Sequence, residues 1–129
     1  MLKLIKSLLK DKAIYLAILL TLIITYLSLA NLKGKSIINF SSIDKVQHAL
    51  AYFTLAVIWM LAFIKKSKKK AVVILCIAFG ILMEFLQANL TSYRSFEYLD
   101  MLANTVGVLI GLLFFNRIEK NLINMLNSL

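Results

Sequence analysis

The chain has 129 residues, of which 61% are hydrophobic and 16% charged, and its formal net charge is +9. Its mean hydropathy of +0.87 is far above that of soluble globular proteins. This composition excludes a soluble domain and indicates a single membrane domain spanning residues 1–129. The only cysteine, Cys76, can form neither an intrachain disulfide nor a cysteine metal site, so we expect it to pack in the interior.

Four apolar segments follow one another along the chain. We predict membrane-spanning helices over residues 13–31, 46–64, 71–89 and 100–116, because roughly 17–25 residues cross the hydrocarbon layer. The predicted fold class is therefore all-α, a polytopic four-helix transmembrane bundle. The first segment also resembles a secretory signal peptide with a cleavage site at Ser28-Leu29-Ala30. Its apolar run exceeds the usual ~7–15 residues of a signal core, so we expect it to remain as a membrane anchor.

Basic residues predict the orientation of the bundle. Most of them lie before the first helix, between the second and third, and after the fourth: Lys3, Lys6, Lys10, Lys12, Lys65, Lys66, Lys68, Lys69, Lys70, Arg117 and Lys120. Because short cytoplasmic loops collect Lys and Arg, both termini are predicted to be cytoplasmic. Apolar residues at helical spacing flank the bundle at both chain ends, and these ends are predicted to be short interfacial amphipathic segments bound to membrane lipids. We expect no nucleic-acid partner, because the lysine run lacks interleaved aromatic residues.

Polar residues within the apolar helices are the candidates for a functional site, since such groups are costly to place near lipid. In the predicted orientation all of them lie in the outer leaflet or the outer loops. They are Asp44, Lys45, His48, Tyr52, Glu84, Gln87, Arg94, Asp100 and Asn104. Asp44, His48 and Tyr52 recur every four residues and therefore share one helix face.

Several of these residues also have structural explanations. Asp44 and Asp100 can cap helices or occupy their first turns. Tyr52 can be an interfacial aromatic residue, and His48 can be a hydrogen-bonded packing residue. Glu84 is harder to explain in this way, because a carboxylate inside an apolar helix costs about 2.5–3.5 kcal/mol. It requires a basic partner, a bound proton or a watery cleft.

The motifs together resemble those of the VanZ-like family of small bacterial membrane proteins. The resemblance covers residues 40–115 and rests on the elements DKxxHxxxY, ExxQ, RS and DxxxN, followed by two glycines. The matching residues are Asp44, Lys45, His48, Tyr52, Glu84, Gln87, Arg94, Ser95, Asp100, Asn104, Gly107 and Gly111. One departure is Ala49, where an aromatic residue commonly follows the histidine. The resemblance implies a protein of the bacterial inner membrane with an outward-facing polar site. The family takes its name from a protein linked to teicoplanin resistance, and the resemblance implies no particular reaction.

Three hypotheses for the function follow. In the first, the site binds an envelope lipid, a lipid-linked sugar or a lipoglycopeptide and contributes to cell-envelope or glycopeptide-antibiotic tolerance. Arg94 and Lys45 would hold the anionic head group. In the second, the protein is an enzyme in which His48 and Glu84 perform acid–base chemistry on a lipid-linked substrate. Asp44 or Asp100 could orient the imidazole. The sequence contains no nucleophile elbow, phosphate loop or three-ligand metal motif. One histidine with carboxylates is only a weak signal for a divalent ion, so we assign no metal and no cofactor.

In the third hypothesis the protein is a structural or assembly subunit of a membrane complex. Asn104, Gly107 and Gly111 form a stripe of helical spacing that allows helices to approach closely. The stripe is predicted to pack helices together, and its Gly107/Gly111 face is a candidate contact for an oligomer.

Overall fold

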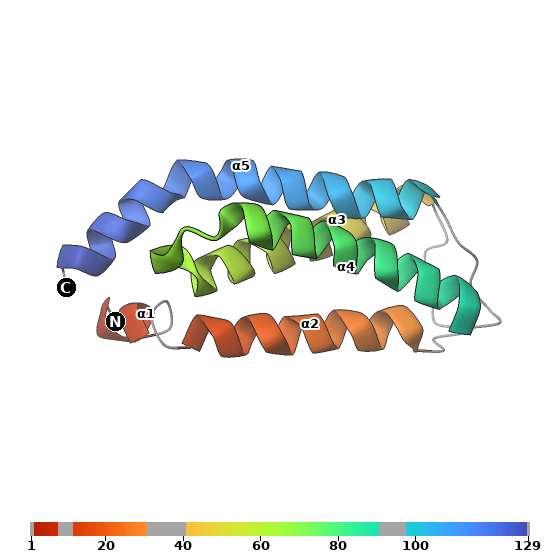
Figure 1. The fold of residues 1–129 in the computed structure, drawn as a ribbon, viewed down its shortest axis with the longest axis horizontal. Coiled ribbons are helices and arrows are strands. Elements are labelled where there is room, and N and C mark those ends of the chain that lie inside the picture. The colour runs from red at the N-terminus through yellow and green to blue at the C-terminus, as the bar shows by residue number, and fades with distance from the viewer. Residues whose placement is uncertain (1, 8–11, 31–40, 91–97, 129) are drawn as a thin grey trace.

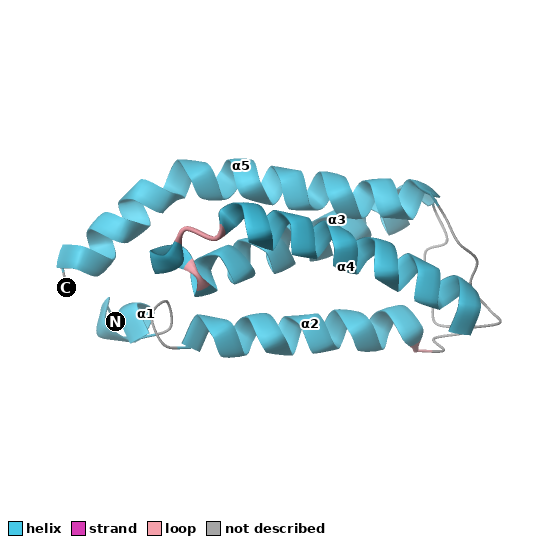
Figure 2. Ribbon diagram, viewed as in Figure 1, coloured by secondary structure: helices cyan, strands magenta, loops and turns pink. Residues whose placement is uncertain are grey.

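A computed structural model describes residues 2–7, 12–30, 41–90 and 98–128. Its elements, in chain order, are α1 (Leu2–Ser7), α2 (Ala13–Leu29), α3 (Ser41–Ala62), the short 3-10 helix η2 (Ile64–Lys66), α4 (Lys69–Leu90) and α5 (Tyr98–Ser128). Within these ranges Figure 2 shows helices and short connections but no strand. The predicted all-α class is confirmed.

Three helices, α3, α4 and α5, are long and apolar enough to cross a membrane. The fourth, α2, has 17 residues, which is the lower end of the roughly 17–25 residues that span the hydrocarbon layer. Large apolar side chains point outward from the bundle, and Leu22, Leu75 and Leu113 are each more than 60% exposed. Such an apolar exterior is suited to lipid rather than to water. The chain is a membrane protein with a four-helix bundle.

The helices α3 and α5 run parallel and form the closest pair, with α4 packed against both. Figure 1 shows α2 on the opposite side of the bundle from α5, and α2 contacts α3 and α4. The apolar core lies between the four helices and consists of Ile24, Tyr52, Leu55, Ala56, Met60, Ile64, Val72, Cys76, Val108, Phe115 and Leu126. The predicted interior packing of Cys76 is confirmed.

Two glycines of α5 allow its close contact with α3. A Cβ atom on Gly107 would lie 2.2 Å from the carbonyl oxygen of Ala49, and one on Gly111 would lie 3.1 Å from that of Phe53. The predicted role of this stripe in helix packing is confirmed. The same face was a candidate oligomer contact, and α3 of the same chain packs against it here. The oligomer contact itself stays a prediction.

The helix boundaries differ from the predicted ones by more than two residues at two places. The predicted fourth span, residues 100–116, lies within α5, which continues to Ser128 and includes the segment predicted to be a separate interfacial end. The chain has no proline that would stop the helix, and Ile118 and Leu122 continue its apolar face onto the core. At the other end of the bundle, α3 begins at Ser41, so Asp44 lies in its first turn.

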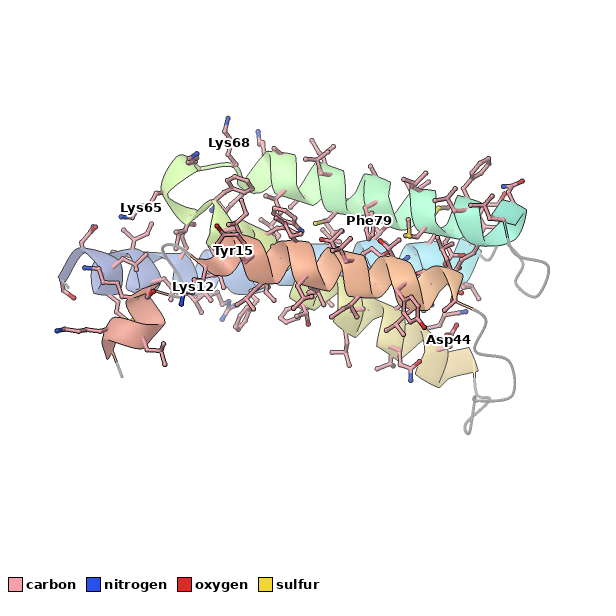
Figure 3. The ribbon with its side chains drawn as sticks, turned by 90° about the horizontal axis from the view of Figure 1, so that it is seen from below. Lys12, Tyr15, Asp44, Lys65, Lys68 and Phe79 are labelled. Atoms are coloured by element: carbon pink, nitrogen blue, oxygen red, sulfur yellow. The ribbon has the colours of Figure 1, made fainter. Side chains whose placement is uncertain are left out.

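Both chain termini lie at the same end of the bundle (Figure 1). Figure 3 shows Lys12, Lys65 and Lys68 at this end and Asp44 at the opposite end. The basic end is also where Lys69 of α4 binds Glu119 of α5, with 2.6 Å between Nζ and Oε2. The fold therefore separates a basic end from the end that carries the candidate site. Which end faces the cytoplasm stays a prediction.

Candidate functional site

The candidate site forms where α3 and α5 begin. Because the two helices are parallel, their N-termini lie side by side, and each places an aspartate in its first turn, Asp44 in α3 and Asp100 in α5. The predicted first-turn positions of both residues are confirmed. The positive ends of two helix dipoles stabilise negative charge at this point. Two carboxylates can therefore lie close together at the end of an apolar bundle.

Lys45 lies between the two carboxylates. Its Nζ donates to Asp100 Oδ1 and lies 3.5 Å from Asp44 Oδ2. The other oxygen of each carboxylate faces His48, whose Nε2 is 3.6 Å from Asp44 Oδ1 and 3.8 Å from Asp100 Oδ2. Each aspartate therefore has one oxygen directed at the lysine and the other directed at the imidazole.

The second nitrogen of the His48 ring contacts α5. His48 Nδ1 is 2.9 Å from Asn104 Oδ1. An amide oxygen can only accept a hydrogen bond, so Nδ1 is the donor and carries a proton. The side chain of Asp100 is 10% exposed and that of His48 is 16% exposed, whereas that of Asp44 is 42% exposed. The cluster formed by Asp44, Lys45, His48, Asp100 and Asn104, called the outer cluster after its predicted side of the membrane, is thus accessible mainly beside Asp44.

Tyr52 lies one helical turn beyond His48 on α3. It is 3% exposed, so it is buried in the bundle rather than placed at an interface. Its hydroxyl has no hydrogen-bond partner among the residues that the structure describes. The ring lies beside Gly80 of α4, where an added Cβ would be 3.1 Å from Tyr52 Cε2 and 3.2 Å from Asn104 Cβ. Gly80 therefore allows α4 to approach α3 and α5 directly below the outer cluster.

The two polar residues predicted on α4 are both buried: Glu84 is 1% exposed and Gln87 is 2% exposed. Gln87 Nε2 donates to the carbonyl oxygen of Ser28 at 2.8 Å and so connects α4 to the end of α2. The sequence did not indicate this partner, because every residue carries a backbone carbonyl. Glu84 lies near enough to Tyr52 to act on it electrostatically. Arg94, the remaining candidate, lies outside the described residues.

An apolar cavity of about 310 Å³ opens between α2, α3 and α4. It is lined by Thr21, Leu55, Trp59, Phe63, Val72, Leu75, Cys76 and Phe79. The indole of Trp59 crosses to α2, where its Nε1 donates to Thr21 Oγ1 at 3.0 Å. Leu55 lies roughly 10 Å farther along α3 than His48, at 1.5 Å per residue. Tyr52 lies between them, four residues after His48 and three before Leu55, so all three share one helix face.

These positions can be compared with known proteins. The VanZ/LLP1 family model matches residues 7–119, most of the chain and every residue of the outer cluster. The chain belongs to the VanZ/LLP1 family. No curated protein and no solved structure matches it. The family resemblance seen in the motifs of this VanZ/LLP1 protein is therefore confirmed.

Proposed function

We propose that this VanZ/LLP1 protein lies in the bacterial inner membrane with both termini in the cytoplasm and binds an anionic, lipid-linked envelope molecule at its outward end. The observation that carries the proposal is that the outer cluster and the apolar cavity share one face of α3. A ligand with a polar head and an acyl chain matches this arrangement. The head group would contact the outer cluster, and the acyl chain would occupy the cavity, roughly 10 Å farther along α3.

Although two carboxylates lie at the outward end, two of its features support an anionic head group. Lys45 supplies a compact cation beside the most exposed carboxylate of the outer cluster, and two helix N-termini add positive partial charge. Arg94, which follows α4 in the chain, is proposed to complete the site. Its planar guanidinium suits the geometry of phosphate or carboxylate. A phospholipid, a lipid-linked sugar and a lipoglycopeptide all present such a group.

A second candidate function is an enzyme that acts on the same kind of lipid. It is favoured by the contacts of His48, because Asn104 holds one ring nitrogen while Asp44 and Asp100 surround the other. An imidazole fixed in this way is positioned for general acid–base catalysis. Glu84, buried nearby on α4, would be its partner in proton transfer.

The binding proposal is tested by purifying the protein in a mild detergent and identifying the co-purified lipids by mass spectrometry. We expect Lys45→Met and Arg94→Ala to lose the bound anionic lipid, and Lys45→Arg to keep it. The matched control is Lys69→Met, which removes another lysine paired with a carboxylate, but at the opposite end of the bundle. Unchanged lipid content in Lys45→Met and Arg94→Ala proteins that accumulate normally would refute the proposal.

The proposed link to envelope tolerance is tested by rescue of a deletion strain. Strains carrying His48→Ala, Glu84→Gln or Arg94→Ala are compared with the parent for sensitivity to lipoglycopeptides, at equal membrane levels of protein. We expect all three to fail to rescue. Rescue equal to that of the parent would show that the polar residues serve only packing and helix capping.

A further inference from the structure

We propose that Asp44, His48 and Asp100 form a site for a divalent metal ion. One ligand atom from each residue lies within 4.8 Å of those of the other two, and His48 Nε2 is 3.6 Å from Asp44 Oδ1 and 3.8 Å from Asp100 Oδ2. The residues come from two helices and are separated by more than fifty positions, so the sequence alone did not reveal a three-ligand site. The inference goes beyond lipid binding and does not depend on it.

The first argument is that every proposed ligand is held by a second residue through its remaining polar atom. Asn104 Oδ1 accepts from His48 Nδ1 at 2.9 Å. Lys45 Nζ pairs with the other oxygen of each carboxylate, Asp100 Oδ1 and Asp44 Oδ2. Metal-binding histidines usually donate their other N–H to an oxygen in this way, and ligating carboxylates are themselves hydrogen-bonded. The lysine thus engages the pair of oxygens that face away from the proposed ion.

The second argument is electrostatic. With Nδ1 held by Asn104, the His48 ring directs Nε2 toward two carboxylate oxygens, at 3.6 and 3.8 Å. Without a proton or a cation on Nε2, these electron-rich atoms would repel one another in an environment of low dielectric. A divalent cation between them would convert the repulsion into three bonds, whereas a second proton on the ring would convert it into ion pairs with the two carboxylates. These two arrangements give different results in the experiment below.

The geometry and the donor atoms indicate the kind of ion. Metal–ligand bonds of about 2.0–2.2 Å in a tetrahedral arrangement place neighbouring donors roughly 3.3–3.6 Å apart. The two measured separations from Nε2 are only slightly longer, so small side-chain movements would close the site. One imidazole nitrogen and two carboxylate oxygens suit Zn²⁺ or Mn²⁺. Three protein ligands leave a position open for water or an anionic oxygen, and the half-exposed Asp44 provides access to it.

The test uses protein purified in detergent without a polyhistidine tag, stripped with a chelator and titrated with Zn²⁺ and, separately, with Mn²⁺. We expect one ion per chain by elemental mass spectrometry. The isosteric change Asp100→Asn and the change His48→Gln should each weaken binding by more than the ~10–100-fold typical of losing an outer hydrogen-bond partner. Glu119→Gln, which removes a carboxylate at the basic end, should leave binding unchanged.

Nitrogen NMR provides a readout that does not require the variants to fold, because His48 is the only histidine in the chain. On adding Zn²⁺ we expect the Nε2 resonance to shift to a metal-bound position while Nδ1 stays protonated. The inference is overturned if both ring nitrogens are protonated with Zn²⁺ present, or if neither ion binds the parent protein. Equal binding by the parent and the Asp100→Asn and His48→Gln variants would also overturn it.

Discussion

The closest contact between α3 and α5 gives the sharpest test of the fold. Replacing Gly107 by alanine places a Cβ atom 2.2 Å from the carbonyl oxygen of Ala49. Nonbonded heavy atoms lie roughly 3.5 Å apart at their optimum, so relief of this clash requires a movement on the order of 1 Å. The atom that must move is backbone rather than the end of a flexible side chain, so the two helices themselves must separate.

Two opposing contributions set the magnitude of the change. Alanine is favoured over glycine in a helix interior by about 0.8–1.0 kcal/mol. Overpacking typically costs about 1–3 kcal/mol, and the short distance from Gly107 to a backbone atom places this variant at the upper end. We therefore expect Gly107→Ala to lose about 2 kcal/mol of stability, a factor of about 30 in the folding equilibrium. Gly111→Ala meets its nearest atom at 3.1 Å, so the two contributions should nearly cancel.

The two variants are compared by reversible unfolding in mixed detergent micelles, followed by circular dichroism. We expect the parent and Gly111→Ala to have nearly equal stability and Gly107→Ala to be clearly less stable than both. The Gly107→Ala variant should also disturb the NMR signal of His48, because Asn104 lies on the same face of α5 one turn away. Equal stability of the two alanine variants would refute the close approach of α3 and α5.

Two further predictions concern the packing around this pair. Thr21→Val removes the acceptor of the Trp59 indole hydrogen bond between α2 and α3. We expect it to lower stability by about 0.6 kcal/mol, the average for hydrogen bonds between membrane helices. An unchanged unfolding midpoint would show that α2 packs without this bond. Lys69→Met removes the ion pair with Glu119 at the basic end. We expect it to lower the stability by less than about 1 kcal/mol, as for other partly exposed pairs. A larger loss of stability in the same unfolding assay would contradict this.

The number of helices and their approximate positions could be predicted from the sequence, because apolar length is the main requirement for crossing lipid. The C-terminal end of α5 could not be predicted in this way. Arg117, Glu119 and Lys120 suggested that the span had finished, yet a helix continues wherever its apolar face still finds a partner. Leu126 does so, since it is 5% exposed within the core. Charge marks the limit of an apolar span but not the limit of a helix.

The membership of the outer cluster was also accessible from sequence, because a polar residue in an apolar helix needs a partner. The contact between His48 and Asn104 was not. The second hypothesis paired His48 with Glu84, and this pair stays a prediction, whereas the contacts of His48 in the structure include Asp44, Asp100 and Asn104. Which side chains meet depends on the rotation of α3 about its axis relative to α5, and the spacing of residues along one helix carries no information about that rotation.

The closeness of α3 and α5 also explains why the outer cluster can exist. Aspartate, asparagine and histidine have short side chains, so they can meet only across closely packed helices. His48 and Asn104 approach to 2.9 Å because Gly107 of α5 packs against Ala49 of α3. Longer acids such as Glu84 could bridge a wider gap, but with more rotamer freedom and less fixed geometry. The close packing at Gly107 is therefore both a source of stability and the condition for the His48–Asn104 contact. A substitution that separates the helices should weaken the site even when it leaves every polar residue in place.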